Sequence, residues 1–226
     1  MEEEVEAFHK NLERQVEERT AELRQTLLVL KKAHLDSVKV LAGTIEAKDP
    51  YTRGHSDRVG RMSMRIAAYL GFREERLESL AFGALLHDIG KIGIRDEVLQ
   101  KPGALSLEEY RHIQEHSLIG VKILDGIEFF KDKILMIRNH HEHFDGSGYP
   151  DGLIGETIPL EARIIAVSDV FDAMTSLRPH RGILSLEDAL GELKGGEGKQ
   201  CDPKILDIFL REKIYKELKM PGSMES

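Results

Sequence analysis

The chain has 226 residues, of which 41% are hydrophobic and 32% charged, and its formal net charge is −8 at pH 7. This is the composition of a soluble globular protein. The negative charge argues against bulk nucleic-acid binding, although a few local positive charges could still hold a small anionic substrate. The single cysteine, Cys201, excludes an intrachain disulfide and favours a reducing, cytoplasmic compartment. The acidic start MEEEVEAF is unlike a signal peptide, and no apolar run approaches about 18 residues, so we expect no membrane insertion.

Residues 1–35 form a region of their own that contains no glycine or proline. Val16, Leu23 and Leu30 repeat every seven residues, which is typical of a two-stranded coiled coil. Companion positions such as Arg19 and Thr26 are polar and could fix the register. We interpret this region as a helical linker that forms a homodimer, and residues 36–226 as the second domain. The alternative is a solvated helix that packs on the body of the protein.

Beyond residue 35 the apolar pattern predicts one helix after another. The helix over 76–91 is apolar nearly all round until His87, so we expect it to be central, and the helix over 162–176 is likewise too apolar to lie on the surface. Gly71 is a plausible C-cap, and Ser106 with Glu109 forms a capping box. The remaining predicted helices cover residues 37–48, 55–71, 105–124, 130–144, 162–176, 185–193 and 203–218. No alternating run is long enough for a substantial sheet, so the predicted fold class is all-α.

Histidines and aspartates recur within these apolar segments. Asp88 ends one buried run and Asp169 interrupts another, and a buried carboxylate costs several kcal/mol unless it is paired or bound to a metal. His140 and His141 point about 100° apart on a helix, so they cannot cover the same patch of core but could reach one nearby ion. The seven candidate ligands are His55, His87, Asp88, His116, His140, His141 and Asp169.

Four of these residues also have a structural alternative. Asp88 could cap the following turn, Asp169 could pair with an arginine, and His55 could cap its helix or lie on the surface. His116 could be an ordinary core histidine, and His112, one turn earlier, competes with it for the inward position. The whole set favours a metal site. Imidazole and carboxylate without thiolate suit iron, manganese, nickel or zinc, and argue against calcium or magnesium.

The stretches LLHDIGKIGI, HHEHFDGSGYP and SDVFDAMTSLRPHR together resemble the HD-GYP branch of the HD phosphohydrolase superfamily, from about Ser37 to about Leu210. The resemblance implies an all-α HD-domain bundle around a dimetal site. It implies hydrolysis of cyclic di-GMP to pGpG, and in some members to GMP, in bacterial second-messenger signalling. It also implies two divalent ions that share Asp88, one held with His55, His87 and Asp169 and the other with His116, His140 and His141. We expect iron or manganese first, then nickel, zinc or cobalt.

Further residues are candidates for substrate binding or for support of the ligands. Lys91, Arg178 and Arg181 could bind phosphate or a guanine edge, the alternative for the arginines being surface salt bridges. Asp172 lies at i+3 from Asp169 and could take part in catalysis by orienting a ligand or a bound water, and Glu142 is a second candidate for such support. We interpret His143 as lying outside the ligand set. In the loop that follows, three glycines permit a sharp turn, namely Gly146, Gly148 and Gly152. Tyr149 forms a lip in this loop, which the resemblance associates with substrate and with a protein partner.

Two departures from the family pattern limit the resemblance. Tyr51 stands four residues before His55, where some members carry a carboxylate, so we expect two ions and no third. Leu177 and His180 replace an acidic residue and an aromatic, which leaves the choice of substrate open. One competing function keeps the metals but acts on another cyclic dinucleotide or a nucleotide. The other is a non-catalytic, ligand-binding signalling module, which the complete set of ligands argues against.

Overall fold

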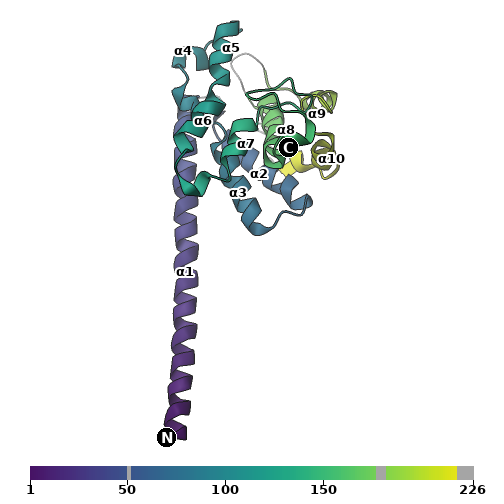
Figure 1. The fold of residues 1–226 in the computed structure, drawn as a ribbon. Coiled ribbons are helices and arrows are strands. Elements are labelled where there is room, and N and C mark those ends of the chain that lie inside the picture. The colour runs from purple at the N-terminus through teal and green to yellow at the C-terminus, as the bar shows by residue number, and fades with distance from the viewer. Residues whose placement is uncertain (50–51, 177–181, 218–226) are drawn as a thin grey trace, which may run out of the picture. The chain divides into compact units, whose positions relative to one another are not determined.

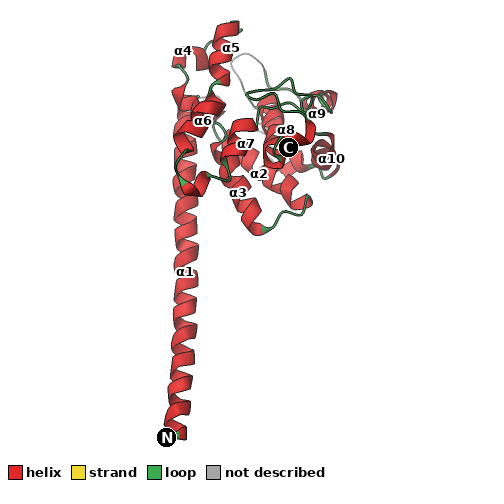
Figure 2. Ribbon diagram, in the orientation of Figure 1, coloured by secondary structure: helices red, strands yellow, loops and turns green. Residues whose placement is uncertain are grey.

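The computed structural model describes residues 1–49, 52–176 and 182–217, and within these ranges the chain forms helices and loops without a sheet (Figures 1 and 2). The prediction of an all-α fold is therefore confirmed. The α-helices are α1 (Glu2–Lys48), α2 (His55–Tyr69), α3 (Glu74–Leu86), α4 (Asp96–Leu99), α5 (Leu107–Gln114), α6 (His116–Leu124), α7 (Ile134–Asn139), α8 (Leu160–Thr175), α9 (Leu186–Gly195) and α10 (Pro203–Arg211). Short 3₁₀ helices are η2 (Ile89–Gly93), η3 (Glu128–Phe130), η4 (Gly155–Thr157) and η5 (Ile214–Glu217).

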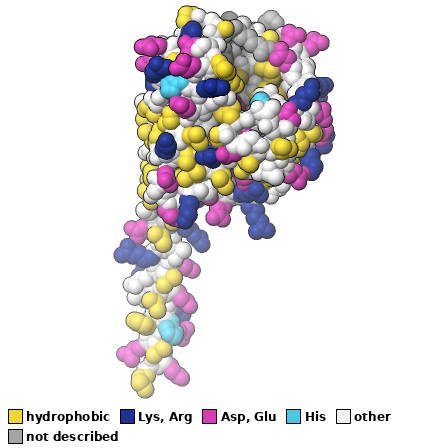
Figure 3. All heavy atoms as spheres, turned by 45° about the horizontal axis from the view of Figure 1, so that its top comes forward, with side chains coloured by type: hydrophobic (Ala, Val, Ile, Leu, Met, Phe, Trp, Pro, Cys, Tyr) yellow, Lys and Arg dark blue, Asp and Glu magenta, His cyan; other side chains and the backbone are white. Residues whose placement is uncertain are grey.

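The chain divides into two compact units, Met1–Val40 and Leu41–Ser226. The first unit consists of most of α1, and apolar and charged side chains alternate over the surface of this helix (Figure 3). Because α1 runs unbroken to Lys48, the helix itself does not mark the boundary that we predict after residue 35. None of the described helices combines the length and the hydropathy needed to cross a membrane.

Several predicted helix ends are confirmed and others are wrong. Gly71 has φ 79° and follows Leu70, the C-cap of α2, and Ser106 and Glu109 form the expected capping box at the start of α5. The helix predicted over 76–91 ends at Leu86, and the helix predicted over 105–124 is two helices, α5 and α6. The segment 130–144 yields only the six residues of α7, and 203–218 yields α10 and η5. The early ends of α3 and α7 and the break between α5 and α6 have a common cause, which lies in the histidines described below.

The core of the second unit lies between α2, α3, α7 and α8. Of these, α3 and α8 come from the two segments predicted to be the most apolar, 76–91 and 162–176. Val59 and Ile66 of α2, Leu80 of α3, and Ile164 and Phe171 of α8 are all fully buried. Burial of a large apolar side chain contributes about 1.5–3 kcal/mol, so these contacts hold the helices that carry the candidate ligands. The helices predicted to be central, around Leu80 and around Phe171, are therefore central.

Glycine allows η2 to lie directly against α6. A Cβ atom on Gly90 would lie 1.8 Å from the carbonyl oxygen of His116 and 2.5 Å from the amide nitrogen of Gly120. Both are backbone atoms, so no side-chain rotation could make room. Since Asp88 immediately precedes η2 and His116 begins α6, this close approach sets the distance between these two residues.

We expect Gly90→Ala to destabilise the protein by about 3 kcal/mol or more, because the backbones of η2 and α6 would have to separate. The control is Gly191→Ala in α9, where an added Cβ meets nothing within 4 Å and alanine favours the helix. Thermal and urea unfolding measure both changes. An unchanged midpoint for Gly90→Ala would show that the two backbones are not in tight contact.

Candidate metal centre

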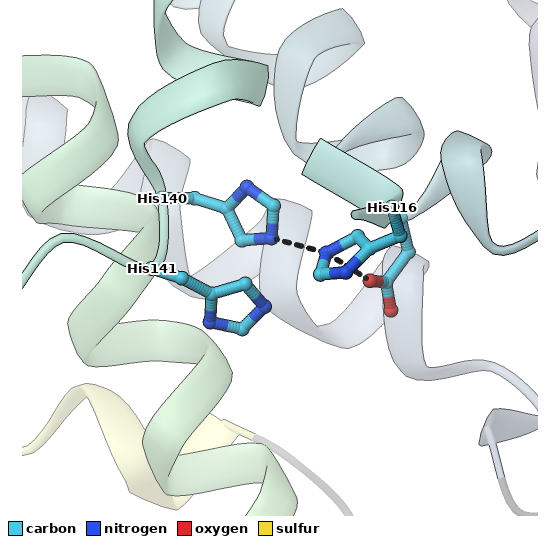
Figure 4. Close-up of side chains that lie close together, drawn as sticks. His116, His140 and His141 are labelled. Carbon is cyan, nitrogen blue, oxygen red and sulfur yellow. Dashed lines mark hydrogen bonds and ion pairs between the residues drawn. The ribbon is translucent and has the colours of Figure 1, made fainter. Parts of the chain in front are cut away.

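The seven candidate ligands come together inside the second unit. They form two groups, and within each group one ligand atom of every residue lies within 4.8 Å of those of the others. The first group is His55, His87 and Asp88; the second is Asp88, His116, His140 and His141. Asp169 joins the first group, because its Oδ1 lies 3.3 Å from His55 Nε2. Figure 4 shows how the rings of His140 and His141 face that of His116. Asp88 is common to both groups.

Backbone carbonyls fix the orientation of three histidine rings. The Nδ1 atoms of His87, His116 and His140 lie 2.6–2.7 Å from the carbonyl oxygen three residues earlier in each case. A carbonyl oxygen only accepts hydrogen bonds, so we assign the proton of each ring to Nδ1. The last carbonyls of a helix lack intrahelical partners, and here the imidazole supplies one. This explains why α3 ends just before His87, α7 just before His140, and α6 begins anew at His116.

The Nε2 atoms of these three rings consequently keep their lone pairs, and those of His116 and His140 face each other. His55 Nε2 lies 3.2 Å from His87 Nε2, and His116 Nε2 lies 3.3 Å from His140 Nε2. With the protons of His116 and His140 on Nδ1, no hydrogen bond joins the second pair. Two nitrogens that each lie about 2.1 Å from one cation are about 3.0–3.4 Å apart, which is the separation here. The donor set therefore fits a divalent metal.

The carboxylate of Asp88 presents one oxygen to each group. Its Oδ1 lies 3.5 Å from His116 Nε2, while its Oδ2 lies 3.6 Å from His87 Nε2 and 3.8 Å from His55 Nε2. The side chain is 10% exposed, so few waters can compete for these oxygens. An arrangement of this kind suits a carboxylate shared between two cations.

Burial keeps the second group of histidines neutral. It lowers the pKa of His116, lowers that of His140 well below the usual value, and lowers that of His141 to about 3. Only a neutral imidazole has a lone pair to give to a metal. These three residues therefore have the protonation state of ligands at neutral pH.

The first group has a different electrostatic balance. Burial raises the pKa of Asp88, but the Lys91 ammonium together with the surrounding histidine rings outweighs this and holds the pKa well below its usual value. Burial likewise lowers the pKa of His55, yet hydrogen bonds to Asp169 and Asp172 raise it to about 9. A cation bound to Nε2 would replace the proton that these two carboxylates favour. The same negative surroundings thus favour a metal ion.

Asp172 supports His55 from outside both groups. Its Oδ2 lies 2.7 Å from His55 Nδ1, and Arg58 donates to both carboxylate oxygens through Nε and Nη2. A carboxylate on the far nitrogen fixes the ring and increases its basicity, as is common for metal-bound histidines. The sequence analysis missed Arg58. The sequence feature that could have indicated Arg58 is its spacing: it lies three residues after His55, just as Asp172 lies three residues after Asp169.

Lys91 lies beside the shared carboxylate. Its Nζ is 2.7 Å from Asp88 Oδ2 and 3.7 Å from Asp49 Oδ2. Glu46, the other nearby acid, accepts hydrogen bonds from the backbone N–H groups of Gly54 and Ser56 and so fixes the start of α2, which presents His55. Tyr51, the position of the doubtful third metal, lies outside the described residues.

The loop after His141 lies against the second group. The Tyr149 ring stacks on that of His141, with centroids 4.9 Å apart. A Cβ on Gly148 would lie 2.2 Å from the backbone nitrogen of His143, so only glycine fits there. Glu142 is 2% exposed and accepts from the N–H groups of Asp151 and Leu153. In these contacts Glu142 holds the loop, whereas the sequence analysis had it as support for a ligand.

The remaining candidates lie elsewhere or cannot be placed. His112 contacts Glu115 and the backbone N–H of Arg95, so His116, and not His112, points into the cluster. His143 contacts Ser147 and belongs to neither group. Arg178 and Arg181, together with Leu177 and His180, lie outside the described residues.

In the comparison with protein families, the model of the HD domain family matches residues 39–205. The cyclic di-GMP phosphodiesterase response regulator RpfG of Xanthomonas campestris is 39% identical over 208 residues, which are 89% of this chain and 55% of that protein. The cyclic di-GMP phosphodiesterase of Thermotoga maritima is 41% identical over 80% of this chain and 49% of its own length. The 3'3'-cGAMP-specific phosphodiesterase 3 of Vibrio cholerae is 39% identical over 80% and 39%, respectively. This chain therefore spans about half, or less, of these relatives.

Solved structures share the fold. The crystal structure of the cyclic GMP-AMP specific phosphodiesterase V-cGAP3 of V. cholerae superposes with a TM-score of 0.62, at 24% identity, over 81% of this chain and 51% of that one. The HD domain of PgpH from L. monocytogenes, solved in complex with cyclic-di-AMP, gives a TM-score of 0.56 at 18% identity over 82% and 99%. At these identities the likeness concerns the arrangement of the helices.

We expect Asp172→Asn to weaken metal binding by about 10- to 100-fold, because His55 loses the carboxylate that orients its ring. Arg58→Gln should act in the same direction. Competition with a chelator of known affinity measures the effect. The control is Asp57→Asn. This exposed carboxylate lies on α2, the helix of His55 and Arg58, and pairs with Arg61. If Asp172→Asn and Asp57→Asn bind metal equally well, the support that we assign to Asp172 is wrong.

Proposed function

Since the chain belongs to the HD domain family, in its HD-GYP branch, we propose that it is a metal-dependent phosphodiesterase that hydrolyses cyclic di-GMP to pGpG, and onward to GMP if the linear product rebinds. The observation that carries this proposal is the position of Asp88, with one carboxylate oxygen toward each of two groups of histidines. Relatives named as cyclic di-GMP phosphodiesterases, at 39% and 41% identity, support the choice of substrate.

We propose two divalent ions, iron or manganese, which would polarise the phosphodiester and activate water for in-line attack. His55, His87 and Asp169 would hold one ion, and His116, His140 and His141 the other, with Asp88 shared. Hard carboxylate and borderline imidazole donors, and no thiolate, support this choice of metals. The buried Cys201 contacts neither group in the described part of the chain.

Side chains around the cluster would hold the substrate. Lys91 places an ammonium group 2.7 Å from the shared carboxylate, so a phosphodiester bound there would lie beside a positive charge. Tyr149 lies at the edge of the second group, where its ring could meet the substrate and its loop a protein partner. Asp172 is 1% exposed and reaches His55, so we assign it positioning and not contact with the reacting atoms. We further propose that Arg178 and Arg181 bind a phosphate or a guanine edge of the substrate.

A second substrate is 3'3'-cGAMP, in which one guanine is replaced by adenine. The relative specific for this compound is as similar to the chain, at 39% identity, as one of the cyclic di-GMP phosphodiesterases. Both substrates carry the same pair of phosphodiesters, so the metal cluster alone does not distinguish them. Turnover of the two compounds, measured side by side, decides between them.

We expect Asp88→Ala to lose both ions and to reduce turnover of cyclic di-GMP and of 3'3'-cGAMP to near background, because one side chain serves both groups. Elemental analysis and product chromatography measure this. The control is Asp207→Ala, which removes an exposed carboxylate from α10. Full metal content with unchanged turnover in Asp88→Ala would contradict the proposed function.

We also propose that α1 forms a parallel homodimer through its heptad positions. Val16, Leu23 and Leu30 are 56%, 64% and 68% exposed, and a stripe of this kind is normally buried against a second helix. Deletion of residues 1–33 should therefore shift the mass in light scattering from dimer to monomer, while turnover per chain is largely retained. A monomeric full chain at tens of micromolar would show that this proposal is wrong.

A further inference from the structure

Lys48, the last residue of α1, makes an unusual set of contacts. Its Nζ donates to the carbonyl oxygens of Ile92 at 2.8 Å and Ile94 at 2.6 Å, and lies 3.4 Å from that of Lys91. Asp96 Oδ1 is 3.3 Å from the same atom. An ammonium group has three N–H donors, so these acceptors use its full capacity. An exposed lysine would instead keep its ammonium in water and its side chain mobile.

The acceptors belong to the turn that follows Asp88. Asp88 is the N-cap of η2, and Lys91 and Ile92 form the last part of that short helix. The final carbonyls of a helix lack partners within it, and here the Lys48 side chain supplies one for the carbonyl of Ile92, whereas that of Lys91 also accepts from the Ile94 N–H. Lys48 is also held in place through its own backbone, since its carbonyl oxygen accepts from Gln100 Nε2 at 3.0 Å.

The turn is thus fixed on two sides. On one side Gly90 touches the backbone of His116 so closely that no side chain fits between them. On the other side the Lys48 ammonium binds the carbonyls of Ile92 and Ile94. Any movement of η2 away from Lys48 would shift Asp88 relative to the first residue of α6. Because interiors are close-packed, such a shift is not absorbed locally.

We propose that Lys48 is a positioning residue of the metal centre, whose ammonium holds the 89–94 turn so that Asp88 stays between the two groups of histidines. The inference rests on the proposed role of Asp88 as a ligand shared by two ions. Because α1 is continuous from Glu2 to Lys48, the helix that carries the proposed dimer stripe also ends at the turn that follows this ligand.

The test is a titration of the metal-free full chain with Mn²⁺, in Lys48→Met, Lys48→Arg and the unchanged protein. We expect Lys48→Met to weaken the binding of Mn²⁺ by about tenfold, since loss of support for a ligand typically has an effect of this size. Arginine keeps a positive charge and several N–H donors, so Lys48→Arg should recover most of the affinity. The control is Lys39→Met, the same change at an exposed position of α1.

Thermal unfolding of the metal-free variants separates positioning from plain stability. A lower midpoint for Lys48→Met with unchanged Mn²⁺ affinity would overturn the inference, because the contacts would then only stabilise the fold. If Lys48→Met does not fold, Lys48→Gln, which keeps two N–H donors without the charge, replaces it. A loss of Mn²⁺ affinity in Lys48→Gln relative to the unchanged protein supports the inference, and no loss overturns it. If the unchanged protein binds neither Mn²⁺ nor Fe²⁺, the proposed function fails, and this inference fails with it.

Discussion

The hydrogen bond from a histidine Nδ1 to the carbonyl three residues earlier underlies the whole centre. It occurs at His87, His116 and His140, and at each place it ends a helix and turns Nε2 toward the cluster. Secondary structure and ligand geometry are therefore set by the same contact. The short α7 and the break between α5 and α6 follow from it, because a carbonyl bonded to an imidazole is satisfied without another helical turn.

The cluster opposes the stability of the fold that contains it. The Nε2 lone pairs of His116 and His140 face each other at 3.3 Å, and Asp88 and Asp169 are withdrawn from water. Buried polar groups without compensation cost free energy, and a ligand that binds only the folded state returns it. The surrounding core of apolar side chains tolerates this cost and keeps the groups from relaxing apart. Lys91 and the pair of Arg58 and Asp172 balance charge at the edge of the cluster.

The sequence predicts the fold class, the buried helices around Leu80 and Phe171, and the capping box at Ser106. The assignment of histidines to one ion or the other was implied by the family resemblance. The spacing of the histidines along the chain does not tell which helix ends meet in the fold. The helix ends at His87 and His140 were misplaced since apolar periodicity continues through them, while the hydrogen bonds that stop the helices depend on ring orientation. Lys48 and Arg58 were missed because each looks like a solvated cation until its distant partner is known.

The most direct test of a shared Asp88 is electron paramagnetic resonance of the protein loaded with Mn²⁺. Two Mn²⁺ ions about 3.5–4 Å apart, bridged by one carboxylate, couple magnetically. We predict the spectrum of a spin-coupled pair at two ions per chain. Two ions per chain with the separate six-line signals of isolated Mn²⁺, or saturation at one ion per chain, would contradict the account.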